Sequence, residues 1–426
     1  MIKSTKKFLL DKFYNFKISL ESFFIALIIF GIPLNLYKNR FYDNSWTVGE
    51  WLISYSGGFV RRGLPGAIIH FISSNYGISP IFLIWLVSVL SLISLSRLLF
   101  HFCNNSFYKS FLLSHLIILA PISEDYLVRK DAFLVLCYGL ALLALKNCHQ
   151  RKLNKVYCIL SVNLLSIIAI LSHEAFGIWA LPSLIIIIYL FERYSNKSIF
   201  KSTLSTIIFL TPSFISFIFC WIFKGSVDQS LMIHESWQDL KDMLPSLGLL
   251  NQSEPSGAIA AIGWGTSQVY TSSLLKQFNL FIFWHPGMWL LTMFISMRLF
   301  IGTNNDPYQT TKRSIICLQL IAFLPLFLFV DIGRWIFMWL TSSALLFSFL
   351  YQTFGFKKLS YFSSTLKGQQ ILTKTIPQFS SIRTYNYVLL FFGIPHCCWS
   401  LGRYLVSNPI GFGIKNIIFY TKFLFS

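Results

Sequence analysis

The sequence predicts an all-α, polytopic transmembrane helix bundle of about eleven spans, and three observations support this fold class. First, 55% of the 426 residues are apolar and only 12% are charged, whereas a soluble domain has roughly a quarter of its residues charged. Second, apolar runs of about 20 residues, the length that crosses a bilayer, recur between short polar clusters. Third, the charges divide between the two sides of these runs. The chain, 1–426, is therefore predicted to form a single transmembrane domain.

The apolar runs define the predicted spans. They lie at roughly 20–37, 79–100, 111–122, 131–146, 156–173, 175–191, 203–223, 278–297, 314–330, 335–351 and 385–405. The first run lacks a small-residue cleavage site and is followed by a basic segment, so we expect it to remain as the first span. Three connecting segments are long: outer loops at 38–78 and 224–277, and a cytoplasmic loop at 352–384.

The net charge of +19 is explained by membrane topology. With a cytoplasmic N-terminus, the inner segments hold 22 of the 35 Lys and Arg residues, and 12 of the 16 acidic residues lie outside. This asymmetry follows the positive-inside rule and predicts a multi-pass protein of the bacterial inner (plasma) membrane. The basic loop at 352–384 is expected to contact lipid headgroups, and the charge calls for no nucleic-acid partner.

A second group of charged residues lies at the predicted outer ends of the spans. These residues come from six separated stretches: Asp43 and Glu50, Arg61 and Arg62, Glu124 and Asp125, Arg129 to Asp131, His173 and Glu174, and Asp331 with Arg334. Ionisable groups at a membrane are costly unless they pair or face a cavity. We therefore expect these stretches to converge on one outward-facing site.

The first outer loop is predicted to carry interfacial helices. Trp46, Trp51, Tyr55 and Phe59 recur at helix-like spacing, which is typical of an amphipathic helix that ends at the glycines 57–58. Gly63 and the proline at 65 mark the start of another helix. The intervening Arg61 and Arg62 suit a phosphate group, because arginine binds phosphate oxygens in a bidentate manner. Adhesion to anionic lipid headgroups is the alternative.

The second acidic stretch precedes a predicted helix. Asp131 is a candidate N-cap of that helix, and Arg129 or Lys130 could assist in binding a donor phosphate. Glu124 and Asp125 have no such local role. Adjacent carboxylates can hold a divalent cation or share a proton, and a solvated turn remains an alternative. No other cofactor is indicated.

Two further pairs interrupt apolar segments. His173 and Glu174 form an unusual turn between two apolar runs and are candidates for binding or orienting a substrate. Asp331 and Arg334 are spaced i, i+3 at a predicted helix start, where an ion pair would serve structure or function equally well.

One aromatic residue of the long outer loop is also a candidate for substrate binding. Trp264 lies among glycines, a setting that suits stacking against a sugar ring, although anchoring at the membrane interface would use the same side chain.

The topology, together with Asp43 in the first outer loop and Glu124-Asp125 in the second, resembles the GT-C class of multi-pass glycosyltransferases. The resemblance implies transfer of a sugar from a polyprenyl-phosphate donor to a glycan acceptor during surface polysaccharide or glycoconjugate assembly. Asp43 would be the general base, with Glu124 and Asp125 as the second acidic motif. An O-antigen or capsule polymerase is the rival hypothesis, and a non-enzymatic flippase or transporter is the third. Charges clustered at one face favour chemistry there over passage through the membrane.

Overall fold

The computed structural model describes residues 19–41, 45–124, 126–194, 198–244, 253–264, 284–303, 306, 308–328, 331–365, 378–397 and 399–425. The described chain is helical, with one isolated bridge between Thr303 and Phe379. The predicted all-α class is therefore confirmed for these residues.

Six described helices are long and apolar enough to cross a membrane. They are α2 (Leu20–Phe41), α5 (Pro80–Cys103), α8 (Asp131–His149), α9 (Lys155–Ser172), α12 (Ile199–Ile222) and α19 (Ile332–Thr365), the last of which is kinked at Gly355. The prediction of a transmembrane protein holds. The predicted number of eleven spans is not confirmed, because other predicted spans are short or interrupted.

Three predicted spans are interrupted helices. The segment 111–122 contains α6 (Lys109–Leu113) and α7 (Ala120–Ser123), 175–191 contains α10 (Ala175–Trp179) and α11 (Leu181–Tyr194), and 385–405 contains α21 (Ile382–Phe391) and α22 (Leu401–Ser407). Pro121, Pro182 and Pro395 lie near the breaks. Proline lacks the amide hydrogen that would continue a helix, so an apolar run containing one need not form a continuous helix.

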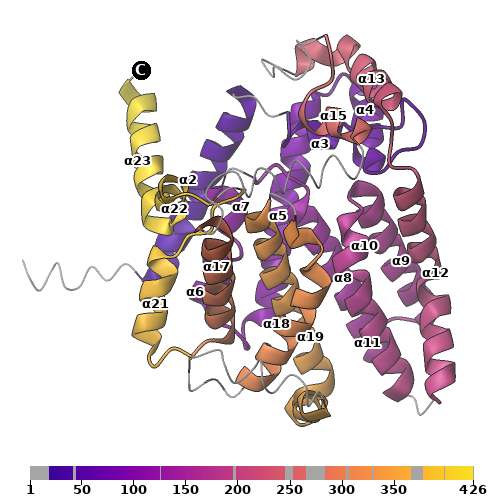
Figure 1. Ribbon diagram of the computed structural model, residues 1–426, viewed down its shortest axis with the longest axis vertical. Helices are drawn as coiled ribbons and strands as arrows, with labels where there is room; N and C mark the ends of the chain where they lie inside the picture. The colour runs from indigo at the N-terminus through magenta and orange to yellow at the C-terminus, as the bar shows by residue number, and fades with distance from the viewer. Residues whose placement is uncertain are drawn as a thin grey trace, which may run out of the picture.

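The remaining helices complete the bundle. They are α17 (Trp284–Ile301), α18 (Gln309–Phe323), the short η3 (Leu326–Leu328) and α23 (Pro409–Phe425). α18 packs against α19. Because α23 packs against α2, the two ends of the described chain meet at one side of the bundle (Figure 1).

The two predicted outer loops fold together on one end of the bundle (Figure 1). The first loop supplies α3 (Gly49–Leu52) and α4 (Gly63–Tyr76). The second supplies α13 (Val227–Ser236), η1 (Gln238–Met243), α15 (Gly257–Ala260) and η2 (Ala261–Gly263). We call this unit the cap, its end of the bundle the cap end, and the opposite end the connector end.

The cap has a hydrophobic core distinct from that of the bundle. Trp51, Ile69, Trp237 and Ile259 are buried in it, and the indole Nε1 of Trp237 donates to the Leu52 carbonyl at 2.7 Å. The amphipathic helix predicted across positions 46–59 is therefore wrong in extent, since only Gly49–Leu52 is helical. Contacts with the second loop bury both faces of this segment and override the periodicity of its aromatic residues.

Candidate functional site

Charged residues from separate segments meet beneath the cap in one chain of contacts. We call this set the ionic network: Glu50, Arg61, Arg62, Arg129, Lys130, Asp131, His173, Glu174, Asp331 and Arg334. Its members lie on α3, between α3 and α4, at the start of α8, between α9 and α10, and at the start of α19. The structure thus brings together most of the residues that the sequence singled out.

The arginine pair sits in a strained turn before α4. Arg62 precedes the helix with a φ of +67°, a region that side chains other than glycine rarely adopt. Gly66, one turn later, allows the segment after α3 to approach closely, because a Cβ there would lie 2.0 Å from the Ile53 carbonyl oxygen. Backbone strain of this kind persists only where the surroundings enforce it, and it concentrates at functional sites.

Both arginines bind Glu174. The Arg62 Nε and Nη2 atoms donate to the two carboxylate oxygens at 2.7 and 2.5 Å, and the Arg61 Nη1 atom donates at 3.2 Å. Burial raises the pKa of Glu174, but Arg62 and Arg61 outweigh it and hold that pKa well below its usual value. Glu174 is therefore ionised at neutral pH. Its carboxylate fills the bidentate position that a phosphate group could also take.

His173 is held in one tautomer. Its Nδ1 atom accepts a hydrogen bond from the Ala175 amide at 3.2 Å, which places the ring proton on Nε2, 3.4 Å from a Glu50 oxygen. Burial, followed by the charge of Arg62, lowers the pKa of His173. A neutral imidazole thus links Glu50 to the Arg62–Glu174 pair.

Glu50 was noted in the sequence but not assigned a role, and the structure places it at the centre of the network. Its side chain is buried, its Oε1 atom faces His173, and its Oε2 atom lies 3.9 Å from Arg334 without a hydrogen-bond partner among the described residues. Burial raises the pKa of Glu50, but the hydrogen bond from His173 and the charge of Arg334 lower it well below its usual value. Glu50 therefore carries a buried negative charge with unused acceptor capacity.

Arg334 joins two carboxylates. Its Nε and Nη2 atoms each donate to Asp131 at 2.6 Å, and its Nη1 atom donates to Asp331 at 2.8 Å. Arg129 also binds Asp331, at 3.0 Å. The predicted i, i+3 ion pair is present. The prediction that Asp131 is an N-cap is wrong, because α8 begins at Asp131 itself and its carboxylate is committed to the buried arginine.

Lys130 ties three segments together beneath the cap. Its Nζ atom donates to the carbonyl oxygens of Ser172 and Arg62 at 3.1 and 3.4 Å and lies 5.6 Å from the centre of the Trp51 ring. Burial lowers the pKa of Lys130 to about 7, although Glu50 opposes this effect. The Lys130 ammonium group therefore uses its donors on backbone carbonyl oxygens.

Not every predicted residue joins the network. Asp43 and Asp125 lie outside the described residues. Glu124 accepts a hydrogen bond from the His396 amide at 2.8 Å. No group of three or more metal-binding side chains suited to a metal ion occurs in the part of the chain that the structure describes.

The predicted aromatic contact lies elsewhere in the cap. Trp264 packs edge-on against Trp46, with ring centres 5.8 Å apart. This contact joins the two outer loops and does not involve the ionic network.

His396 was not among the residues predicted from the sequence. The residue lies in the extended stretch between α21 and α22, its carbonyl oxygen accepts from the Gly333 amide at 3.0 Å, and its ring stacks on Tyr126. It also interacts electrostatically with Asp331. Pro395-His396 interrupts the apolar run at 385–405, and a polar residue after a proline within a predicted span was the available signal for a broken helix.

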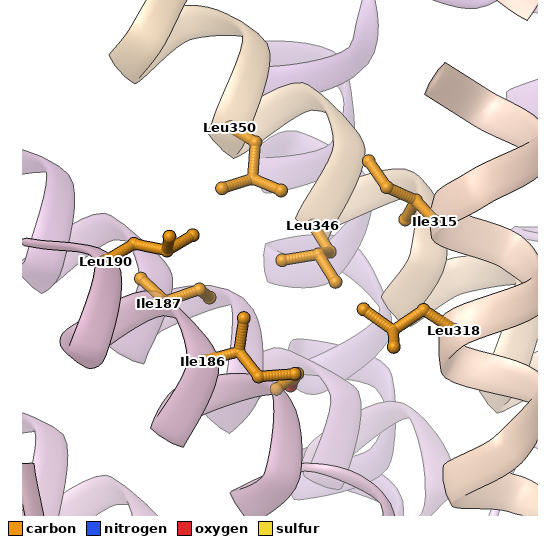
Figure 2. Close-up of a pocket in the computed structure, with 8 residues that line it drawn as sticks. Ile186, Ile187, Leu190, Ile315, Leu318, Leu346 and Leu350 are labelled. Carbon is orange, nitrogen blue, oxygen red and sulfur yellow. The ribbon is translucent and has the colours of Figure 1, made fainter. Parts of the chain in front are cut away.

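A separate cavity lies within the bundle, between α11, α18 and α19 (Figure 2). It is small, and Ile187, Ile315, Leu346 and Leu350 are among its mostly aliphatic lining residues. These walls supply no group for catalysis. Ser183 also lines it, but its hydroxyl contacts that of Tyr138 at 2.9 Å.

Comparison with known proteins identifies a family but points to no activity. The family model described as "Uncharacterised membrane protein Rv1490" matches residues 22–235, which is half of the chain. The chain belongs to this family. The matched region includes the arginine pair, Glu50, His173 and Glu174, whereas Asp331 and Arg334 lie beyond it. No curated protein and no solved structure matches the chain.

Proposed function

We propose that this member of the Rv1490 family transfers a sugar from a polyprenyl-phosphate carrier to a glycan acceptor at one face of the inner membrane. The observation that carries the proposal is the Arg61–Arg62 pair clasping Glu174 at the cap end of a membrane bundle. A carboxylate and a phosphate present similar paired oxygens to arginine. The Arg61 Nε atom is buried without a hydrogen-bond partner among the described residues, which leaves a donor for an incoming anion.

The geometry suits a lipid-borne donor. Arg61 and Arg62 lie beneath the cap, and their side chains are 20% and 23% exposed, so an anion can reach them. The segment from His173 onward leads through α10 into α11, which lines the apolar cavity. The cationic end and this apolar wall therefore belong to one stretch of chain.

In the proposed reaction the acceptor oxygen bonds to the anomeric carbon as the bond from that carbon to the phosphate oxygen breaks. The phosphate leaves with the electron pair, and the acceptor hydroxyl gives its proton to the Asp43 carboxylate, a role that rests on the GT-C resemblance. Arg61 and Arg62 offset the charge that grows on the departing phosphate, with Arg129 and Lys130 adding positive potential. Glu174 must give up part of its contact with the arginines as the phosphate enters.

Two observations favour other functions. A polymerase that depends on arginines would use the same Arg61–Arg62 pair. A flippase or transporter would use interrupted helices, of which the segments 109–123 and 175–194 are examples. The buried charges cluster at one end of the bundle, which supports chemistry at that face as the first choice.

The functions are separated by surface-glycan analysis in a deletion strain complemented with variants. Arg62→Ala and Asp43→Asn are each expected to lower transfer, the latter by about 100-fold, a typical loss for general base catalysis. The control Arg151→Ala, at an exposed turn on the connector end, should restore wild-type glycan. Loss of one sugar addition supports a transferase, whereas unpolymerised single repeats support a polymerase. Wild-type amounts and lengths of glycan from both Arg62→Ala and Asp43→Asn would contradict both the transferase and the polymerase hypothesis.

The proposal places the cap outside the cytoplasm. The basic connector segments support this orientation through the positive-inside rule. Cysteines introduced at 253–264 should react with a membrane-impermeant reagent in intact cells, and cysteines at 378–383 should not. The reverse pattern would put the site on the cytoplasmic face.

A further inference from the structure

The ionic network has a second open end, at Asp331. Both of its arginine partners bind the same carboxylate oxygen, Oδ2, at 3.0 Å from Arg129 and 2.8 Å from Arg334. The side chain is 27% exposed, compared with 11% for Glu174 and 3% for Glu50. Its other oxygen, Oδ1, has no partner among the described residues. Asp331 thus presents one ordered, accessible acceptor.

His396 lies beside this carboxylate with an uncommitted ring nitrogen. Its Nε2 atom is buried and has no hydrogen-bond partner in the described part of the chain. The residue is held instead through its backbone, by Glu124 at its amide and Gly333 at its carbonyl, and by stacking on Tyr126 with ring centres 5.1 Å apart. The fold fixes the imidazole without using its hydrogen-bonding capacity.

The approach of this segment to α19 requires a glycine. A Cβ at position 333 would lie 2.1 Å from the Pro395 carbonyl oxygen and 2.7 Å from that of His396. A buried polar group left without a partner costs about 1–3 kcal/mol, so a ligand or water molecule that bonds the His396 ring nitrogen would recover that free energy.

The two free atoms select the chemistry of that ligand. A carboxylate oxygen only accepts hydrogen bonds, whereas an imidazole nitrogen donates in one tautomer and accepts in the other. A hydroxyl group both donates and accepts, so one hydroxyl can donate to the carboxylate while it accepts from a protonated Nε2. With the other tautomer, two hydroxyls of one sugar ring can each donate to one of the two atoms. An ionised phosphate has only acceptor oxygens, so it cannot donate a hydrogen bond to the Asp331 carboxylate. The geometry therefore favours an alcohol over an anion.

We propose that Asp331 Oδ1 and His396 Nε2 form a hydroxyl-binding subsite for a sugar ring, at the opposite end of the ionic network from Arg61 and Arg62. The assignment of this subsite to the acceptor glycan rests on the proposed function. Binding of a sugar at the subsite does not depend on that function. Glu50, His173 and Arg334 connect the two ends through contacts of 3.4 to 3.9 Å. The network then holds a phosphate group at one end and orients a hydroxyl-bearing ring at the other.

The test is saturation-transfer-difference NMR on the full chain in lipid nanodiscs, with the methyl glycosides of glucose, galactose, mannose and N-acetylglucosamine as probes. At least one glycoside should receive saturation from the wild-type protein. His396→Ala and Asp331→Asn should each weaken its binding by about tenfold, the effect expected for a lost hydrogen bond to a buried or charged group. His396→Ala is the deciding variant, because the backbone contacts of residue 396 remain.

Matched controls make the result specific. His70→Ala changes a cap histidine whose ring contacts the Ser236 carbonyl oxygen, and Asp306→Asn changes a carboxylate at the connector end. Neither should alter glycoside binding. No saturation of any glycoside, or equal saturation in wild type and His396→Ala, would overturn the subsite.

A further variant separates the subsite from the proposed function. Arg62→Ala should retain glycoside binding while losing donor use. Glycoside binding that depends on His396 in a protein without transfer activity would refute the transferase and leave the subsite standing.

Discussion

The two ends of the bundle bury charge in different ways. At the connector end, Lys312 donates to Asp306 at 2.6 Å, and its Nζ atom lies 4.1 Å from the centre of the Phe107 ring. Burial lowers the pKa of Lys312, and Asp306 opposes this effect. At the cap end, ten residues share contacts, and atoms such as Glu50 Oε2 and Arg129 Nε stay without hydrogen-bond partners among the described residues.

This difference indicates different roles. Lys312 and Asp306 form a compact pair that holds Asp306 against the start of α18, since Asp306 also accepts from the Tyr308 amide. The two charges neutralise each other, so the pair does not need to be exposed to solvent. The cap-end network keeps partly exposed members and spare hydrogen-bonding capacity, which supports the proposed role in binding a substrate.

The largest expected effect comes from removing one shared partner of the network. Arg334→Ala leaves Asp131 buried without its bidentate partner. It also removes one of the two arginines that bind Asp331, so only Arg129 remains there. Breaking a buried ion pair from one side costs about 3–5 kcal/mol. Unfolding in mixed micelles, followed by circular dichroism, should show this loss. A change below about 1 kcal/mol would mean that the network does not stabilise the fold.

The next effect is a pH dependence at the cap end. Because the folded pKa of Lys130 is about 7, below its usual 10.5, the unfolded chain binds more protons between these values. The free energy of unfolding should therefore rise with pH across this window, by at most about 1.4 kcal/mol per pH unit. Below pH 7 Lys130 is protonated in both states, and the stability gained at alkaline pH is lost. Lys130→Met should flatten the curve. An unchanged slope in that variant would assign the effect to another group.

A smaller effect should distinguish the isolated pair from the network. Lys312→Met alone leaves Asp306 without its cation, but Lys312→Met with Asp306→Asn removes both charges and keeps the acceptor for Tyr308. The double variant should lie within about 1 kcal/mol of wild type, because apolar or neutral replacement of a whole buried pair is often tolerated.

The matching experiment uses the network. Arg334→Met with Asp131→Asn should not recover stability to the same degree, because Asp331 and Glu50 still face the missing cation. Equal recovery at both ends, measured by unfolding in mixed micelles, would mean that the two ends bury charge in the same way.

The smallest effect concerns backbone strain. Both non-glycine residues with positive φ in the described chain are arginines, Arg62 at the cap end and Arg151 in an exposed turn at the connector end. Arg151→Gly should leave stability unchanged or raise it by up to about 1 kcal/mol, since glycine adopts this conformation without strain. Arg62→Gly should relieve the same strain yet lower stability through loss of the Glu174 contacts, as thermal unfolding would show.

Sequence reasoning located the class of protein and much of the network, because both depend on local signals. Apolar length identifies spans, and charges such as Arg62 and Glu174 stand out in an apolar chain. It failed where the outcome depended on distant segments. Asp131 looked like a helix cap because its partner, Arg334, lies 203 residues away. His396 was hidden within an apolar run, and its importance follows from contacts with Glu124 and Gly333.

The cap core also sets an order of events during synthesis. The first loop is made early, but Leu52 and Ile69 are covered by Trp237 and Ile259, which leave the ribosome only after α12 has been translated. Until then the first loop lacks the part of its core that the second loop supplies, although α4 can already pack against α5 and α9. A nascent chain ending after Ile222 would hold five of the six long apolar helices yet lack a closed cap.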